Sequence, residues 1–346
     1  MSNSSALKLV FGGAPISPNP NFGAYFPDEE SIEKLYQLLE EGGVDAIDTA
    51  CAYGSSEEWI GKTGGGKRFP VDSKTPGGFI PGSSTGESIP QHAKESVERT
   101  RVEKKAMPFF MILGYRKPFI HNPSAFNIEN LDKQLGLGSL NAKFKHVYAA
   151  LLCIVFQPVA VQSAFKWLKL DVLYIHAPDP SVLLEDQLQG VNTAYTAGYF
   201  KRFGLSNFSP ADVQRVYDIC KEKGYPLLGH QTANYSAVAR KNEVVLFPLL
   251  RKLGIAVYVY SPIAGGLLTK TSAQVRTREG AGRYSKDAGA LEALYGGLYN
   301  KPSYYTALDL WGEAANGAGC SGAELAYRWV AFDSAVDGKS WSMKRL

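Results

Sequence analysis

The stretch Ala46-Ile47-Asp48-Thr49-Ala50-Cys51-Ala52-Tyr53-Gly54 combines a short apolar strand with an acid at its end and a tyrosine in the loop after it. Two later apolar strands also end in a polar group, Phe69-Pro70-Val71-Asp72-Ser73-Lys74 and Asp171-Val172-Leu173-Tyr174-Ile175-His176. Because the carboxyl ends of parallel strands meet at one edge of a sheet, we expect Asp48, Tyr53, Lys74 and His176 to share one pocket.

Short apolar strands alternate with amphipathic helices on both sides of this stretch. The predicted strands are residues 7–12, 46–50, 68–74, 171–177, 203–207, 227–235 and 256–261. The predicted helices are residues 28–43, 55–64, 184–198, 211–223, 243–254 and 322–332. This alternation predicts a parallel sheet, and the number of repeats favours a closed (β/α)8 TIM barrel over an open sheet. The segment Phe11-Gly12-Gly13-Ala14-Pro15 lacks the GxGxxG fingerprint, which argues against a Rossmann domain.

Local signals support individual helices. Ser209 followed by Pro210 is typical of a helix cap with proline at the first helical position. Apolar residues at helical spacing predict the buried faces of two other helices. These residues are Ile32, Leu35, Leu38 and Leu39 in the first helix, and Leu246, Leu249, Leu250 and Leu253 in the second.

The four polar residues suit proton transfer to a carbonyl oxygen. A phenol has a pKa of about 10 in water, and a nearby ammonium lowers it by about 1–3 units. Lys74 is the candidate ammonium, held by Asp48, while His176 would orient the carbonyl oxygen that Tyr53 protonates as a hydride reaches the carbon. Each of the four residues alone could have a purely structural role. Their occurrence together at successive strand ends favours a catalytic role instead.

Composition excludes several other classes of protein. The chain has 346 residues, 45% of them hydrophobic, and a net charge of +4, which indicates a soluble globular protein without a basic nucleic-acid face. Four scattered cysteines without CxxC spacing argue against structural zinc and a disulfide framework, and favour reduced thiols in the cytosol. The amino-terminal residues do not resemble a signal peptide.

Two single segments allow an alternative interpretation. His176 and Asp179 form a possible metal pair, but no third ligand occurs at a recognisable spacing, so no metal is expected. Residues 147–165 form a possible membrane span. Their uninterrupted apolar run, residues 147–156, is shorter than the ~20 residues that a spanning helix needs, so a buried strand or core helix is preferred.

Five stretches resemble the aldo-keto reductases, and most closely the aflatoxin-aldehyde-reductase type found widely in fungi. They are residues 48–54, 72–78, 173–179, 202–208 and 258–269. The resemblance extends over residues of about 8–100 and 163–335. It implies NADPH (NADP+ after reaction) as the cofactor, and a small aldehyde or ketone as the substrate. It further implies that Tyr53 is the proton donor, tuned by Lys74 and Asp48, and that His176 contacts the substrate.

The resemblance also implies a cofactor site. Ser206, Asn207 and Gln231 would hold the nicotinamide carboxamide, and Tyr260 would stack on the ring. The glycine pair Gly265-Gly266 suits close approach of the main chain to the pyrophosphate. The full set is Asp48, Ser206, Asn207, Gln231, Tyr260, Ser261, Pro262, Ile263, Ala264, Gly265, Gly266, Leu267 and Lys270. We expect a cytoplasmic monomer or homodimer without nucleic-acid or membrane partners.

The chain departs from the family in two places. Lys74 and His176 lie 102 positions apart, whereas a βα unit averages ~30 residues. Residues 104–161 are therefore predicted to be an insertion of 55–60 residues within a single barrel domain spanning 1–346, either a lid or the translation of a retained intron. After residues 322–332 the chain is short, so we expect the barrel to be incomplete at its eighth strand and last helix. Lys344 and Arg345 are candidate replacements for the missing 2′-phosphate ligands.

The leading hypothesis is therefore an NADPH-dependent carbonyl reductase. The alternatives are a cofactor-binding barrel without catalysis, comparable to regulatory subunits of the same family, and an inactive product of an altered gene. The sequence does not choose between detoxification and secondary metabolism. Arg240 is either a contact for an acidic substrate or, as we prefer, a surface residue.

Overall fold

The computed structural model describes residues 8–18, 25–100, 169–278, 283–284, 290–332 and 338–341. The chain divides into two units, Met1–Val102 with Leu170–Leu346, and Glu103–Lys169. Almost all described residues belong to the first unit, which contains the strands and helices named below. The predicted insertion, residues 104–161, lies outside the described residues, as do residues 147–165, Lys344 and Arg345.

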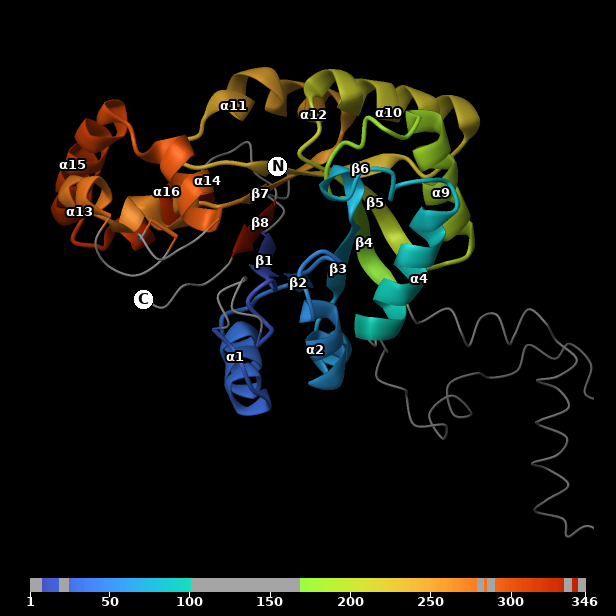
Figure 1. The fold of residues 1–346 in the computed structure, drawn as a ribbon, viewed down its shortest axis with the longest axis horizontal. Coiled ribbons are helices and arrows are strands. Elements are labelled where there is room, and N and C mark those ends of the chain that lie inside the picture. Colours follow the sequence, from blue (N-terminus) through green and yellow to red (C-terminus); the bar gives the residue numbers. More distant parts are fainter. Residues whose placement is uncertain are drawn as a thin grey trace, which may run out of the picture. The chain divides into compact units, whose positions relative to one another are not determined.

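Eight parallel strands form a closed barrel in the order β1 to β8, with β8 paired to β1. Figure 1 labels these strands. The (β/α)8 architecture predicted from the sequence is thus confirmed. The strands are β1 (Lys8–Gly12), β2 (Ala46–Asp48), β3 (Val71–Thr75), β4 (Leu170–Ile175), β5 (Phe200–Ser206), β6 (Leu228–Asn234), β7 (Ala256–Tyr260) and β8 (Gly338–Trp341).

The eighth strand corrects one expectation. β8 is four residues long and pairs with both β1 and β7, so the barrel closes where an open gap was expected. The physical reason is that strand pairing uses main-chain groups. The edges of β1 and β7 would otherwise expose unpaired N–H and C=O groups, which a short segment satisfies whatever its side chains. β8 is the last described element, and no helix follows it within the described part of the chain.

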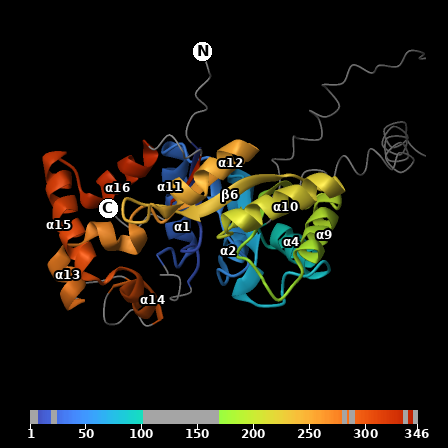
Figure 2. The ribbon, with the colours of Figure 1, turned by 90° about the horizontal axis from the view of Figure 1, so that it is seen from above.

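Helices connect the strands and surround much of the barrel (Figures 1 and 2). Those before β7 are α1 (Glu29–Glu41), α2 (Ser56–Lys62), α3 (Gly65–Arg68), η2 (Gly77–Phe79), α4 (Ser88–Thr100), α9 (Leu184–Thr196), α10 (Pro210–Lys223), α11 (Lys241–Val245) and α12 (Phe247–Leu253). Those after β7 are η4 (Ala264–Thr269), α13 (Ser272–Thr277), α14 (Ala290–Tyr299), α15 (Pro302–Gly317) and α16 (Gly322–Ala331). Sequence patterns did not predict helix α4 or helices α13 to α15.

The capping residues correctly predicted the start of α10, whereas the spacing of apolar residues predicted the buried face of α1 less accurately. Ser209 caps α10 by accepting a hydrogen bond from the Asp212 N–H, with Pro210 at the start of the helix, as predicted. In α1 the buried residues are Ile32, Leu35, Tyr36 and Leu39, whereas Leu38 is 58% exposed. Tyr36 takes the buried position because its hydroxyl can pair with Thr63 while its ring packs on Phe69.

The predicted helix over residues 243–254 is two helices, which corrects that assignment. α11 ends at Val245 and α12 begins at Phe247. Pro248 explains the break, because proline lacks an N–H and its ring clashes with the preceding turn, so it is tolerated only near a helix start. Leu246 and Leu250 remain buried, which keeps the predicted apolar face largely intact.

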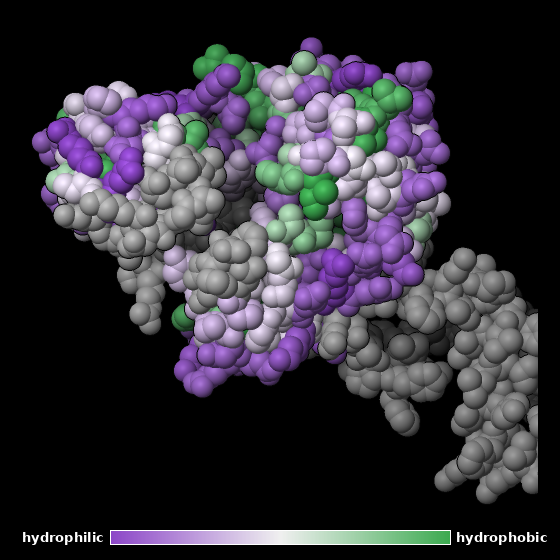
Figure 3. All heavy atoms as spheres, in the orientation of Figure 1, coloured by the Kyte–Doolittle hydropathy of each residue, from purple (hydrophilic) through white to green (hydrophobic). Residues whose placement is uncertain are grey.

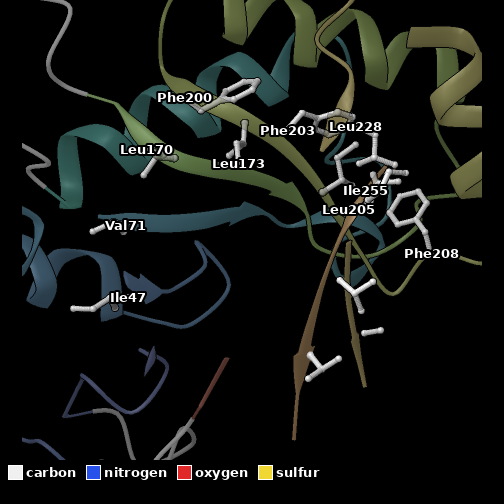
Figure 4. Close-up of a cluster of buried hydrophobic side chains, with 14 of the residues drawn as sticks. Ile47, Val71, Leu170, Leu173, Phe200, Phe203, Leu205, Phe208, Leu228 and Ile255 are labelled. Carbon is white, nitrogen blue, oxygen red and sulfur yellow. The ribbon is translucent and has the colours of Figure 1, made fainter. Parts of the chain in front are cut away.

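The main core lies between the strands and the helices that cover them. Figure 4 shows part of it, with buried side chains from β2 to β5 and from the start of β6 gathered in one cluster. The labelled residues are Ile47, Val71, Leu170, Leu173, Phe200, Phe203, Leu205, Phe208, Leu228 and Ile255. Because alternate residues of a strand face opposite sides, this packing leaves the intervening side chains to face the barrel interior.

A second hydrophobic cluster lies beyond β7. It joins the loop after β7 to the helices that follow, through Ile263, Leu267, Leu268, Tyr299 and Leu308. Figure 1 shows α13 to α16 grouped on this side of the barrel. This second cluster therefore packs the loop after β7 against the helices that follow it.

None of the described helices combines the length and the apolar composition that crossing a bilayer requires. Among the residues coloured in Figure 3, hydrophilic side chains cover most of the face, and hydrophobic side chains form small separate patches. The described surface therefore carries no extended apolar belt on this face.

Candidate active site

Asp48, Tyr53, Lys74 and His176 converge at the carboxyl ends of β2, β3 and β4. Asp48 is the last residue of β2, Lys74 lies near the end of β3, and His176 directly follows β4. Lys74 Nζ donates a hydrogen bond to Asp48 Oδ1 at 2.5 Å and lies 5.2 Å from the centroid of the Tyr53 ring. The Tyr53 hydroxyl lies 3.4 Å from His176 Nε2. The structure therefore brings together all four residues that sequence reasoning selected.

Lys74 and Asp48 form a buried ion pair. Lys74 is 3% exposed and Asp48 8%, and Lys74 Nζ also donates to the Thr49 carbonyl at 2.7 Å. Burial has the largest single effect on Lys74 and favours its neutral form, but the charge and hydrogen bond of Asp48 together with Tyr53 and Asp72 act in the opposite direction, so the pKa of Lys74 is raised. Lys74 is thus a fixed positive charge beside Tyr53.

The Tyr53 phenol is not acidified in the chain alone, which corrects the expectation of a lowered pKa. Burial raises the pKa of Tyr53, whereas the charge of Lys74 and its hydrogen bond act in the opposite direction. Removal from water penalises a phenolate more than the ammonium compensates. Tyr53 therefore carries its proton at neutral pH, and Lys74 reduces the cost of losing it.

His176 is a neutral imidazole. Burial, together with the positive charge of Lys74, lowers the pKa of His176 to about 3. Its Nδ1 is buried and has no hydrogen-bond partner among the described residues. A neutral ring with its proton on Nε2 can donate a hydrogen bond to an oxygen placed near the Tyr53 hydroxyl.

The lowered pKa of His176 predicts a specific acid sensitivity. In the unfolded chain His176 binds a proton below about pH 6.5, whereas in the folded chain it binds one only below about pH 3. Between these two values the proton favours the unfolded state, so the free energy of unfolding decreases as the pH falls. We expect the wild type to lose about 1 kcal/mol per pH unit more than His176→Asn between pH 6 and 4.5. Urea unfolding at a series of pH values measures this, and equal losses in the two proteins would contradict it.

Phe79 is a site residue that sequence reasoning missed. Its ring packs edge-on against His176 with centroids 4.7 Å apart, although 60% of its surface is exposed. The available signal was the pair Gly77-Gly78 after Lys74, since a built Cβ at Gly77 would lie 2.4 Å from the Ala177 oxygen, and one at Gly78 2.0 Å from the Pro178 oxygen. Only glycine permits this contact between the loops after β3 and β4, which places Phe79 beside His176.

This contact predicts that Gly78→Ala is destabilising. The added methyl group would meet main-chain atoms that cannot move without separating the two loops, so we expect a loss of at least about 2 kcal/mol. Gly312→Ala is the matched control, because a Cβ there meets no atom within 4 Å. It lies inside α15 and should stabilise by up to about 1 kcal/mol. Denaturant unfolding of both variants measures these changes in stability. Similar unfolding midpoints for Gly78→Ala and Gly312→Ala would contradict the close contact between the loops after β3 and β4.

The residues expected to hold the nicotinamide lie next to this group. Asn207 Nδ2 donates to the His176 carbonyl at 3.0 Å and to Ser206 Oγ at 3.1 Å, while its Oδ1 accepts from the Tyr260 hydroxyl at 2.6 Å. Gln231 is fully buried, and its Oε1 lacks a partner among the described residues. A buried amide with an unused acceptor fits a carboxamide N–H donor, so the residues present are compatible with a nicotinamide.

The loop after β7 offers mainly its main chain. Ser261, Ala264, Gly265 and Gly266 all have positive φ, which is uncommon for residues with a Cβ and concentrates at binding loops. The side chains of Ile263, Ala264 and Leu267 pack into the second cluster, and Pro262 is also buried whereas Lys270 is half-buried. Any contact that Ile263, Ala264 or Leu267 makes with a cofactor would therefore come from backbone atoms.

Other candidate residues have different partners. Arg240 forms an ion pair with Glu243 and stacks over Trp329, which matches the preferred surface interpretation. Asp179 accepts hydrogen bonds from Gly82 N and from Ser181, rather than facing His176 as a ligand. The described residues contain no group of three or more His, Cys, Asp or Glu side chains arranged to hold a metal ion.

Comparison with known proteins is consistent with this geometry. The profile of the aldo/keto reductase family matches residues 8–108 and 161–343, which is more than half of the chain. The chain belongs to the aldo/keto reductase family. Residues 109–160 are the internal part of the chain that the profile leaves unmatched, and they fall inside the predicted insertion.

Several curated proteins are similar to this chain. Oxidoreductase sirO of Leptosphaeria maculans is 36% identical over 186 residues, which are 52% of this chain and 56% of that protein. An aldo-keto reductase of Pseudocercospora fijiensis is 34% identical over 171 residues, 49% of this chain and 57% of that one. Human aflatoxin B1 aldehyde reductase member 4 is 40% identical over 101 residues, 29% and 30% of the two chains. The matched segments span little more than half the length of the first two relatives.

Proposed function

We propose that the protein is an NADPH-dependent reductase that converts an aldehyde or ketone to the alcohol, with Tyr53 as the proton donor. The observation that carries this proposal is the position of the Tyr53 hydroxyl, 3.4 Å from the neutral His176 ring and beside the Lys74–Asp48 ion pair. A protonated phenol, a hydrogen-bond donor and a fixed positive charge at one point suit the formation of an alkoxide and its protonation.

Each residue has a separate role in this proposal. His176 orients the carbonyl oxygen through its Nε2–H, and Tyr53 transfers its proton to that oxygen. The positive charge of Lys74 stabilises the phenolate that remains, and Asp48 holds Lys74 in place. Ser206, Asn207 and Gln231 would hold the nicotinamide carboxamide, and Tyr260 would lie against its ring. The bound cofactor supplies a hydride to the carbonyl carbon.

The cellular setting is part of the proposal. The thiols of Cys51, Cys220 and Cys320 are free, which is compatible with the reducing cytoplasm that we propose for the protein. Relatives named as an oxidoreductase and as an aflatoxin B1 aldehyde reductase support an aldehyde as substrate. Aldehyde detoxification and secondary metabolism are the two settings that the proposal includes.

The direct test is to mix the purified protein with NADPH and 4-nitrobenzaldehyde and to follow absorbance at 340 nm. A decrease that depends on both the protein and the aldehyde supports the proposal. Binding of NADPH, detected by its fluorescence, without any decrease over a panel of aldehydes would instead indicate a cofactor-binding protein without catalysis. A melting transition that is not cooperative would indicate an inactive product.

A further inference from the structure

We propose that Glu57 is a positioning residue, which holds the Tyr53 hydroxyl in place relative to Lys74 through a buried link between α2 and β3. This inference rests on the proposed reductase function, because the pair that Glu57 aligns is the proposed proton donor and its ammonium neighbour. Glu57 is 2% exposed, although it is a carboxylate on a helix at the outside of the barrel. Burying a carboxylate costs free energy unless both of its oxygens are paired, so the burial of Glu57 requires partners for both oxygens.

Both oxygens of Glu57 have partners from other elements. Ser73 of β3 donates its hydroxyl proton to Oε1 at 2.5 Å, and Arg99 of α4 donates to Oε2 at 3.3 Å. The helices α2 and α4 also approach closely here, since a Cβ at Gly61 would lie 1.9 Å from the Arg99 oxygen. Glu57 therefore joins three elements at one point.

The positions along the chain connect this link to the active site. Tyr53 precedes α2 by a few residues, and the Ser56 N–H donates to the Tyr53 carbonyl at 3.3 Å, so the tyrosine is attached to the first turn of the helix. Ser73 is the neighbour of Lys74 in β3. Because successive residues of a strand face opposite sides, Ser73 faces the helices while Lys74 faces the barrel interior. The Glu57–Ser73 bond thus fixes α2, whose first turn is hydrogen-bonded to Tyr53, to the strand that carries Lys74.

Other contacts hold the same segment but do not make Glu57 redundant. Ser56 Oγ donates to the Gly13 carbonyl at 2.8 Å and pairs with Thr49 at 2.9 Å, which attaches α2 to β1 and to the end of β2. The Cys51 thiol donates to the Lys74 carbonyl at 3.0 Å. The bond from Glu57 to Ser73, by contrast, attaches the side of α2 to β3 itself. A displacement of about 1 Å at a reacting group can cost about 100-fold in rate.

The test uses Glu57→Gln and Ser73→Ala, with Glu58→Gln as the matched control. Glu58 lies beside the same arginine, 3.8 Å from Arg99 Nε, but its side chain is 62% exposed. We expect the two test variants to lower kcat by about 10- to 100-fold, with the Kd for NADPH changed by less than about twofold. The control should keep wild-type kcat. Because Glu57 acts through Ser73, the double variant should be no slower than the slower single variant.

A second readout does not depend on turnover. The Tyr53 phenol is titrated by NMR of tyrosine labelled at the ring carbon that bears the hydroxyl, with the signal assigned from Tyr53→Phe. Because Lys74 opposes the rise in the pKa of Tyr53, loss of alignment should shift this titration to higher pH in both test variants. If both fold cooperatively and retain the wild-type kcat and titration, Glu57 has only a structural role and the proposal is wrong.

The outcomes separate this inference from the proposed function. Should Glu57→Gln fail to fold, Ser73→Ala decides, since it removes only the hydroxyl of a buried serine. If the wild type reduces no aldehyde but the Tyr53 titration still shifts in Ser73→Ala, the alignment is supported and the reductase activity is not. If the wild type is active and both test variants keep its kcat and its Tyr53 titration, the proposed reductase activity is supported and the positioning role of Glu57 is refuted.

Discussion

Tyr53→Phe is expected to abolish carbonyl reduction while leaving the fold and NADPH binding intact. The variant loses only the hydroxyl, and removal of a positioned general acid lowers rates by about 10²–10⁴-fold. The Tyr53 hydroxyl lies 3.4 Å from His176 Nε2, in the polar site rather than in the hydrophobic core, so stability should change by less than about 1 kcal/mol. Steady-state rates at 340 nm and fluorescence titration with NADPH measure the two effects separately.

The matched control is Tyr195→Phe. Tyr195 lies on α9, is 44% exposed and packs against Phe200, away from the four site residues. It should keep the wild-type kcat. Turnover by Tyr53→Phe at more than about a tenth of the wild-type rate would contradict the assignment of Tyr53, given the size expected for a general acid. Equal losses of NADPH affinity and rate would indicate a binding role for the phenol instead.

Lys74→Met is expected to damage both catalysis and stability. Catalysis should fall by about 10²–10³-fold, because the positive charge that stabilises the phenolate is lost from a site with little water. Stability should fall by about 3–5 kcal/mol, because the buried Asp48 carboxylate loses the ammonium that compensates its charge. Activity assays and denaturant unfolding of the same preparation test the two expectations.

A double variant separates the two effects of Lys74. Asp48→Leu combined with Lys74→Met removes both charges and fills similar volume, which should restore most of the lost stability. It should not restore activity, because no ammonium remains beside Tyr53. If activity returned together with stability, the contribution of the Lys74–Asp48 pair would be structural, and the proposed mechanism would fail.

The arrangement of Asp48 and Lys74 could be predicted from the sequence because their strands are neighbours. β2 and β3 pair in parallel with Asp48 opposite Asp72, and residues two apart in a strand face the same side. Lys74 therefore lies on the side of Asp72, next to the end of β2. His176 follows the same rule one strand further on, since Lys74 pairs with Tyr174. Because parallel strands pair in a regular register, the positions of residues along neighbouring strands predict which side chains lie close together.

Other features depend on contacts between distant parts of the chain. Helix α2 was predicted, but the burial of Glu57 depends on Ser73 and Arg99, which lie 16 and 42 positions away. The position of Phe79 depends on main-chain contact between the loops after β3 and β4. The closure of the barrel depends on free edges at β1 and β7 that a short segment can satisfy. Apart from the pair Gly77-Gly78, which indicates the close approach beside Phe79, no local sequence pattern predicts these contacts.

The sequence by itself determined the type of fold and the chemical groups at its strand ends. Periodic apolar residues specify strands and helices locally, and parallel pairing then places Asp48, Lys74 and His176 at one end of the barrel. Only the tertiary structure decided the charge states of the site. Burial raises the pKa of Tyr53 and lowers that of His176, whereas at Lys74 the negative groups around it, Asp48 foremost, together raise the pKa against the effect of burial. The physical reason is that desolvation and Coulomb energy sum over every neighbouring group, most of them remote in the chain.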